Sequence, residues 1–160
     1  SLKVLDLSNF NTENVDDMHY MFADCYNLEE LNISSFNTVN VIDMGNMFYK
    51  CLKLLSLDVS NFNTEKVTDI SNMFADCESL KTLNLSSFNT ENVTDMYGMF
   101  KNCVCLKKLD LSSFSTENVT HMINMFKDCE SLKTLNLRCS TDATILNNLI
   151  SVALIQSMLS

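Results

Sequence analysis

The cysteines are the residues of this chain most able to do chemistry, as metal ligands, disulfide partners or nucleophiles. The 160 residues include 7 of them. Five are spaced 26 residues apart, namely Cys25, Cys51, Cys77, Cys103 and Cys129. A constant spacing predicts a repeated coil with one of these cysteines at the same place in each copy. When such coils stack, equivalent positions have parallel Cβ directions, which is a poor arrangement for a disulfide. We therefore expect five buried free thiols that pack as small apolar side chains.

The remaining candidates for chemistry are isolated. Cys103-Val104-Cys105 lacks a second pair and a nearby histidine, which disfavours zinc. Cys139 lies outside the 26-residue pattern and is the thiol we expect to react most readily. His19 and His121 hold different positions in the pattern, so stacking does not join them as a ligand pair. With no phosphate-binding glycine loop either, the sequence predicts a chain that is not an enzyme and holds no metal or cofactor.

The cysteines form one column of a repeat that runs through most of the chain. Two phenylalanine columns share the 26-residue period: Phe10, Phe36, Phe62, Phe88 and Phe114, then Phe22, Phe48, Phe74, Phe100 and Phe126. A methionine column consists of Met21, Met47, Met73, Met99 and Met125. A fixed period of this length predicts stacked coils, each resting on its neighbours. We expect these columns to form the core.

The residue pattern within one coil predicts a strand followed by a helix. Residues 28–33 alternate apolar and polar side chains, as in a short half-buried strand. Between Val41 and Cys51 the apolar residues recur at helical spacing, and Asn40 is placed to cap such a helix. The start of this segment is a weak helix former, so a short extended bridge before one helical turn is the alternative.

Residues 138–160 leave the pattern. Residues 143–159 are largely apolar and predict one helix that is too short to span a membrane. We expect two units, an array of coils over residues 1–137 and a C-terminal capping helix over residues 138–160. A membrane-surface or oligomerisation helix is the alternative, because this segment is apolar nearly all round.

Composition limits the possible partners. Apolar residues make up 46% of the chain, which excludes a disordered protein, and the formal net charge is -9. Residues 1–80 hold 13 acids and 4 lysines, whereas residues 81–160 hold 7 acids and 7 bases. No basic stripe is evident, so nucleic acid is not an expected partner. A basic protein surface would be attracted to the acidic half.

The outward position of the expected strands alternates charged and neutral side chains. Neighbouring strands lie ~4.8 Å apart, where two carboxylates repel by about 0.9 kcal/mol even in water, so alternation avoids adjacent like charges. A serine column lies beside it. We expect this surface to bind a basic or polar protein segment, with a merely solvated face as the alternative. Its residues are Asp6, Ser8, Asn32, Ser34, Asp58, Ser60, Asn84, Ser86, Asp110 and Ser112.

The repeat unit resembles a known family. Residues 2–25 read Leu-x-x-Leu-Asp-Leu-Ser-Asn-Phe-Asn-Thr-Glu-Asn-Val-x-Asp-Met-x-x-Met-Phe-x-x-Cys, and residues 80–103 repeat this with Asn84 and Ser87 as variants. The unit is similar to the BspA-like leucine-rich repeat of bacterial, protist and mycoplasma surface proteins. That resemblance covers residues 2–137. It implies an α/β fold, a right-handed leucine-rich-repeat solenoid with a parallel sheet on one face and short helices on the other.

The same resemblance implies a function. We expect a non-catalytic protein-binding module of a cell-surface or secreted adhesion protein, which binds host extracellular or neighbouring-cell proteins through its outward sheet face. The family shares no catalytic residues, and we expect no membrane span in this segment. Because the chain begins inside the pattern, we expect a piece of a longer array. An intracellular or periplasmic scaffold is the alternative, favoured if the free thiols need a reducing compartment. An enzyme whose active site lies outside this segment is the least favoured option.

Overall fold

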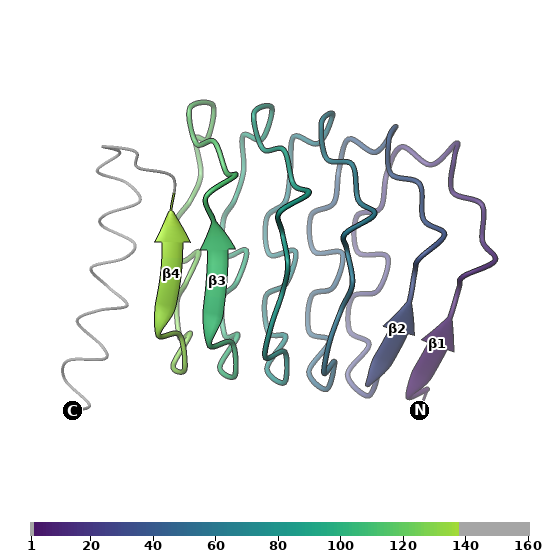
Figure 1. The fold of residues 1–160 in the computed structure, drawn as a ribbon, viewed down its shortest axis with the longest axis horizontal. Helices are drawn as coiled ribbons and strands as arrows, with labels where there is room; N and C mark the ends of the chain where they lie inside the picture. Colours follow the sequence, from purple (N-terminus) through teal and green to yellow (C-terminus); the bar gives the residue numbers. More distant parts are fainter. Residues whose placement is uncertain (1, 138–160) are drawn as a thin grey trace.

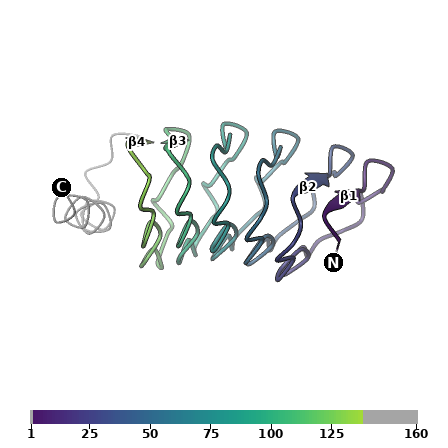
Figure 2. The same cartoon turned by 90° about the horizontal axis from the view of Figure 1, so that it is seen from below.

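A computed structural model of the chain describes residues 2–137. Successive coils lie side by side along one axis, which Figures 1 and 2 show from two directions. Four short strands lie on one side of the stack: β1 (Val4–Asp6), β2 (Glu30–Asn32), β3 (Lys108–Leu111) and β4 (Thr134–Leu137). The C-terminal helix expected over residues 138–160, whether as a cap or in its alternative roles, lies outside the described residues.

The strands pair in parallel with a register of one repeat. Leu5 lies opposite Leu31 in the β1·β2 pair, and Leu109 lies opposite Leu135 in the β3·β4 pair. A second ladder of single parallel bridges runs elsewhere in the coils, through Asp17, Asp43, Asp69, Asp95 and His121. The 26-residue period of the sequence is therefore the period of the backbone pairing.

The predicted α/β solenoid with helices on one face is wrong, because residues 2–137 contain no helix. The segment that was expected to be helical directs its N–H groups to two kinds of acceptor. The Phe48 N–H donates to the Met73 carbonyl of the next coil at 2.9 Å, while the Met47 N–H donates within its own turn to Met44 at 3.3 Å. Left-handed residues at Asn46 (φ 57°) and Lys50 (φ 59°) interrupt the turns. An α-helix needs continuous i to i−4 bonds and right-handed residues, so none forms.

The predicted parallel sheet forms only at the two ends of the described stack. The described residues form two separate two-stranded sheets, β1·β2 and β3·β4. In the two middle coils the residues equivalent to these strands, 56–58 and 82–84, do not form strands. Their coils are joined instead by the second ladder and by further backbone hydrogen bonds between coils, such as Asn72 N–H to Tyr97 O at 2.7 Å.

The core columns are confirmed except at their first members, since Phe10, Met21 and Cys25 are not buried. In the second phenylalanine column the ring centroids of successive residues lie 5.6 to 5.9 Å apart, from Phe22 to Phe126. Met47, Met73 and Met99 are fully buried between the coils. Offset ring stacking at such separations adds to the stabilisation that comes from burying the apolar surface.

Buried threonines add a polar ladder inside the stack. Thr64 Oγ1 donates to the Asn89 carbonyl at 2.8 Å, and the Asn89 N–H donates back to Thr64 Oγ1 at 2.8 Å. Thr12, Thr38 and Thr90 make the same exchange with the coil that follows each of them. Because a buried hydroxyl must be hydrogen-bonded, this exchange fixes the register of neighbouring coils.

Candidate functional site

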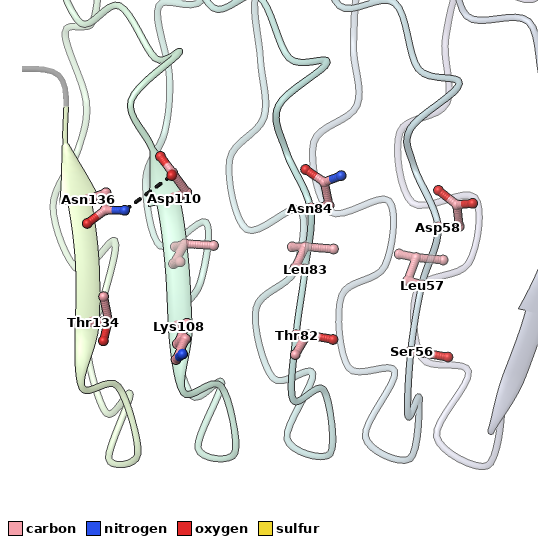
Figure 3. Close-up of a pocket in the computed structure, with 11 residues that line it drawn as sticks. Ser56, Leu57, Asp58, Thr82, Leu83, Asn84, Lys108, Asp110, Thr134 and Asn136 are labelled. Carbon is pink, nitrogen blue, oxygen red and sulfur yellow. Dashed lines mark hydrogen bonds between the residues drawn. The ribbon is translucent and has the colours of Figure 1, made fainter.

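The outward strand face carries an open hollow of about 520 Å³ that spans four coils. Figure 3 shows its side chains arranged in rows across the strands. Its lining residues are Ser56, Leu57, Asp58, Thr82, Leu83, Asn84, Lys108, Leu109, Asp110, Thr134 and Asn136. A second hollow of about 490 Å³ lies over β1 and β2 and shares Ser56 and Asp58 with the first.

Each acidic side chain of this face is held by a serine of its own coil. The Ser8, Ser60 and Ser112 N–H groups donate to the carboxylates of Asp6, Asp58 and Asp110, each at 2.9 Å. This is the Asx-turn arrangement, in which a side chain bonds to the backbone two residues on. Hydrogen bonds from these serines lower the pKa of all three carboxyl groups, because they stabilise the charged form.

The neutral members of the alternating column have the same local geometry. The Ser34 N–H donates to Asn32 Oδ1 at 3.2 Å, and the Ser86 N–H donates to Asn84 Oδ1 at 3.1 Å. At the end of the column, Asn136 Nδ2 donates to Asp110 Oδ2 at 3.2 Å (Figure 3). An amide thus stabilises a neighbouring carboxylate where a second acid would repel it.

The ten predicted site residues divide into two groups. Asp58, Asn84 and Asp110 line the larger hollow, and Asp6 and Asn32 line the smaller one. The five serines line neither hollow. Their backbone N–H groups orient the outward side chains instead, so the structure gives the serines a positioning role: Ser8, Ser34, Ser60, Ser86 and Ser112.

A group of lysines that was not expected from the sequence lies at one end of the larger hollow. Lys81, Lys107 and Lys133 are exposed, hold equivalent positions in three consecutive coils, and adjoin Lys108 of β3. Their 26-residue spacing was the signal that could have revealed them. The lysines are far apart along the chain and form a group only across the coils.

The thiol column is structural. Cys51, Cys77, Cys103 and Cys129 are buried, and each thiol donates to a phenylalanine carbonyl of the preceding coil at 3.0 to 3.3 Å. Burial raises the pKa of all four, to about 12 for Cys51 and Cys129. A thiol that keeps its proton is a poor nucleophile and a poor metal ligand. Cys25 and Cys105 are half-buried, and Cys139 lies outside the described residues.

The two histidines lie in separate places, as expected from their positions in the repeat. His19 Nδ1 lies 3.1 Å from Asp43 Oδ1, whereas His121 Nδ1 lies 3.8 Å from Asp95 Oδ2. Within residues 2–137 no group of three or more histidine, cysteine or acidic side chains is placed to hold a metal ion. In the same part of the chain there is no helix long and apolar enough to cross a membrane.

Comparison with known protein families identifies a family model that matches the chain. A family model described as "Mycoplasma protein of unknown function, DUF285" matches residues 2–82 and again residues 53–143. No curated protein matches the chain. The two overlapping matches together cover the stacked coils and the candidate surface on them.

Proposed function

We propose that this chain, which belongs to the family described as Mycoplasma protein of unknown function, DUF285, is a non-catalytic protein-binding module of a cell-surface adhesion protein. The resemblance of its repeat to BspA-like leucine-rich repeats supports this proposal. The partners would be host extracellular or neighbouring-cell surface proteins, bound through the outward strand face.

The observation that carries the proposal is the arrangement of Asp58, Asn84 and Asp110 in one hollow, each exposed and each held by a hydrogen bond from its own coil. Side chains that are already held in place lose less conformational entropy when a partner binds. The carboxylates also attract basic partners from a distance. A rigid polar surface of this kind supports recognition of a polar or basic protein segment.

A charge reversal on the face tests the proposal. We expect the double variant Asp58→Lys with Asp110→Lys to abolish binding to immobilised host extracellular proteins in surface plasmon resonance, without unfolding the array. The matched control is Asp16→Lys with Glu65→Lys, because these exposed acids change the net charge equally and line neither hollow. Unchanged affinity of the first variant would reject this face as the binding site.

An intracellular or periplasmic interaction scaffold is the second candidate. The observation that favours it is the column of buried free thiols, which a reducing compartment preserves. Determining where the full-length protein is located in its native source, by protease accessibility on intact cells, separates the two candidates. Shaving of the coils from intact cells supports surface display, and complete protection supports the scaffold.

A further inference from the structure

Four lysines form a continuous basic group at one end of the larger hollow. The Lys107 N–H donates to the Lys81 carbonyl at 3.4 Å, and the Lys133 N–H donates to the Lys107 carbonyl at 3.0 Å. Lys108 follows Lys107 as the first residue of β3 and lines the hollow, where Figure 3 shows it in the lower row. We call Lys81, Lys107, Lys108 and Lys133 the lysine strip; all four are exposed.

The charge of the lysine strip is not compensated. Within residues 2–137, none of its members makes an ion pair or a side-chain hydrogen bond. In the first two coils the equivalent column is neutralised, since Lys3 Nζ lies 2.8 Å from Glu29 Oε1. Like charges on adjacent coils ~4.8 Å apart repel by about 0.9 kcal/mol in water. The acidic column avoids this cost by alternation, but the lysine strip does not.

The neighbouring side chains in the hollow are hydroxyl donors. Ser56, Thr82 and Thr134 line the same end as Lys108, and their hydroxyl groups make no hydrogen bond within the described chain. Ammonium and hydroxyl groups are the donors that carboxylates accept from. The acids Asp58 and Asp110 come two residues after Ser56 and Lys108, roughly 6.6 Å away along an extended backbone. The hollow therefore has a cationic edge and an anionic edge.

We propose that this hollow binds an extended protein segment in which acidic and basic residues alternate, lying across the strands. Its acidic side chains contact the lysine strip and its basic side chains contact Asp58 and Asp110. In an extended chain successive side chains point in opposite directions, so an alternating segment presents one charge to each edge. A nucleic acid strand carries only negative charge and would be repelled at the edge formed by Asp58 and Asp110. This inference rests on the proposed function and names the chemistry of the partner.

Peptide binding tests the inference directly. The probe is a fluorescein-labelled peptide of about eight residues that alternates Glu and Lys, compared with an all-Glu peptide of equal length. We expect fluorescence anisotropy to detect binding of the alternating peptide, and the affinity to fall as salt is raised from roughly 50 to roughly 200 mM. The triple variant Lys81→Gln, Lys107→Gln, Lys133→Gln should weaken that affinity about tenfold or more. The matched control is Lys50→Gln, Lys66→Gln, Lys127→Gln, whose residues line neither hollow.

The outcomes separate this inference from the proposed function. Equal affinity of the strip variant and the wild-type chain for the alternating peptide overturns the inference, as does no binding by the wild-type chain. Tighter binding of the all-Glu peptide, or of a single-stranded oligothymidine of about ten nucleotides, overturns it in favour of a polyanion site. In any of these cases the proposed function stands if Asp58→Lys with Asp110→Lys still abolishes binding to host proteins. Thermal unfolding of each variant shows that the fold is kept.

Discussion

The first and third coils place the same residue types in different environments. Phe10 and Phe62 hold equivalent positions, yet Phe10 is 57% exposed and Phe62 is 2% exposed. Met21 is 44% exposed, whereas its equivalent Met73 is fully buried. Full burial at these two positions therefore needs a neighbouring coil on each side, and the described chain gives the first coil a neighbour on one side only.

Hydrogen bonds show the same difference and give it a direction. The backbone N–H and carbonyl of Asn63 bond to Thr38 of the preceding coil, while the equivalent Asn11 backbone has no such partner within the described residues. On the side of the following coil, the first coil makes the same hydrogen bonds as the third. Thr12 bonds to Asn37 as Thr64 bonds to Asn89. In this threonine exchange the first and third coils therefore differ only on the side of the preceding coil.

The largest expected effect comes from truncating a phenylalanine between two coils. Phe62→Ala should lower the free energy of unfolding by about 3 to 5 kcal/mol, because it leaves a cavity beside the Phe88 ring. Phe10→Ala should cost about 1 kcal/mol or less, because its side chain is already largely in water. Urea denaturation measures both. Equal costs would show that the first coil is as well packed as the third.

A threonine substitution should test the directional part of the comparison. Thr64→Val removes the hydroxyl that bonds to Asn89 and should cost about 1 to 3 kcal/mol, because the N–H and carbonyl groups of the half-buried Asn89 lose their partner. Thr12→Val should cost about as much, although Thr12 lies in the first coil, because its hydroxyl makes the same two hydrogen bonds with the coil that follows. Urea denaturation again measures both variants. A much smaller cost for Thr12→Val would mean that the whole first coil, rather than one face, is loosely held.

The thiol column predicts a loss of stability in alkali. Burial raises the pKa of Cys77 well above its usual range and that of Cys51 to about 12, so the folded chain keeps these protons. The unfolded chain releases them above about pH 8.5. Stability should therefore be complete below about pH 8.5 and fall progressively toward about pH 12. Denaturation midpoints measured across this range should fall less steeply for Cys77→Val than for the wild-type chain.

The variant to compare with Cys77→Val is Cys25→Val, at the equivalent position of the first coil. Cys25 is half-buried, and its thiol has no partner in the described chain, whereas Cys77 donates to the Phe48 carbonyl. Burial also raises the pKa of Cys25, but its thiol is less enclosed, so its replacement should change the alkaline slope less. A larger change for Cys25→Val than for Cys77→Val would contradict the proposed link between enclosure and alkaline sensitivity.

The repeat period and the buried columns could be predicted because they depend only on residue type at a fixed spacing. Met47 was expected to lie in the core, and it is fully buried together with Val41 and Met44 of the same segment. The helix expected from the same residues was wrong, because inward-facing positions recur similarly in a chain of tight turns. Asn46, which adopts a left-handed conformation, was a local signal against a helix, since asparagine tolerates that conformation better than most residues.

The candidate surface was predictable in part for a related reason. The outward column that includes Asp58 and Asp110 follows from strand alternation within one coil. The lysine strip and the bond from Asn136 to Asp110 arise between coils, so they require reading charged residues across the period rather than along the chain. The positioning role of the serines depends on backbone direction at the end of each strand, and residue spacing alone does not reveal it.

The smallest expected effect is on acid stability, and it should be the same in the first and third coils. Hydrogen bonds from serine lower the pKa of Asp6 and Asp58, so the stability that these carboxylates give is present above about pH 3.9 and lost as the pH falls below it. Asp6→Asn and Asp58→Asn should each slightly reduce the drop in melting temperature between about pH 7 and pH 3, to a similar extent. Both serine donors belong to the same coil as the acid they bond, at 2.9 Å in each case. A distinctly larger effect for Asp58→Asn would mean that neighbouring coils also stabilise the carboxylate, and that even this local bond depends on the stack.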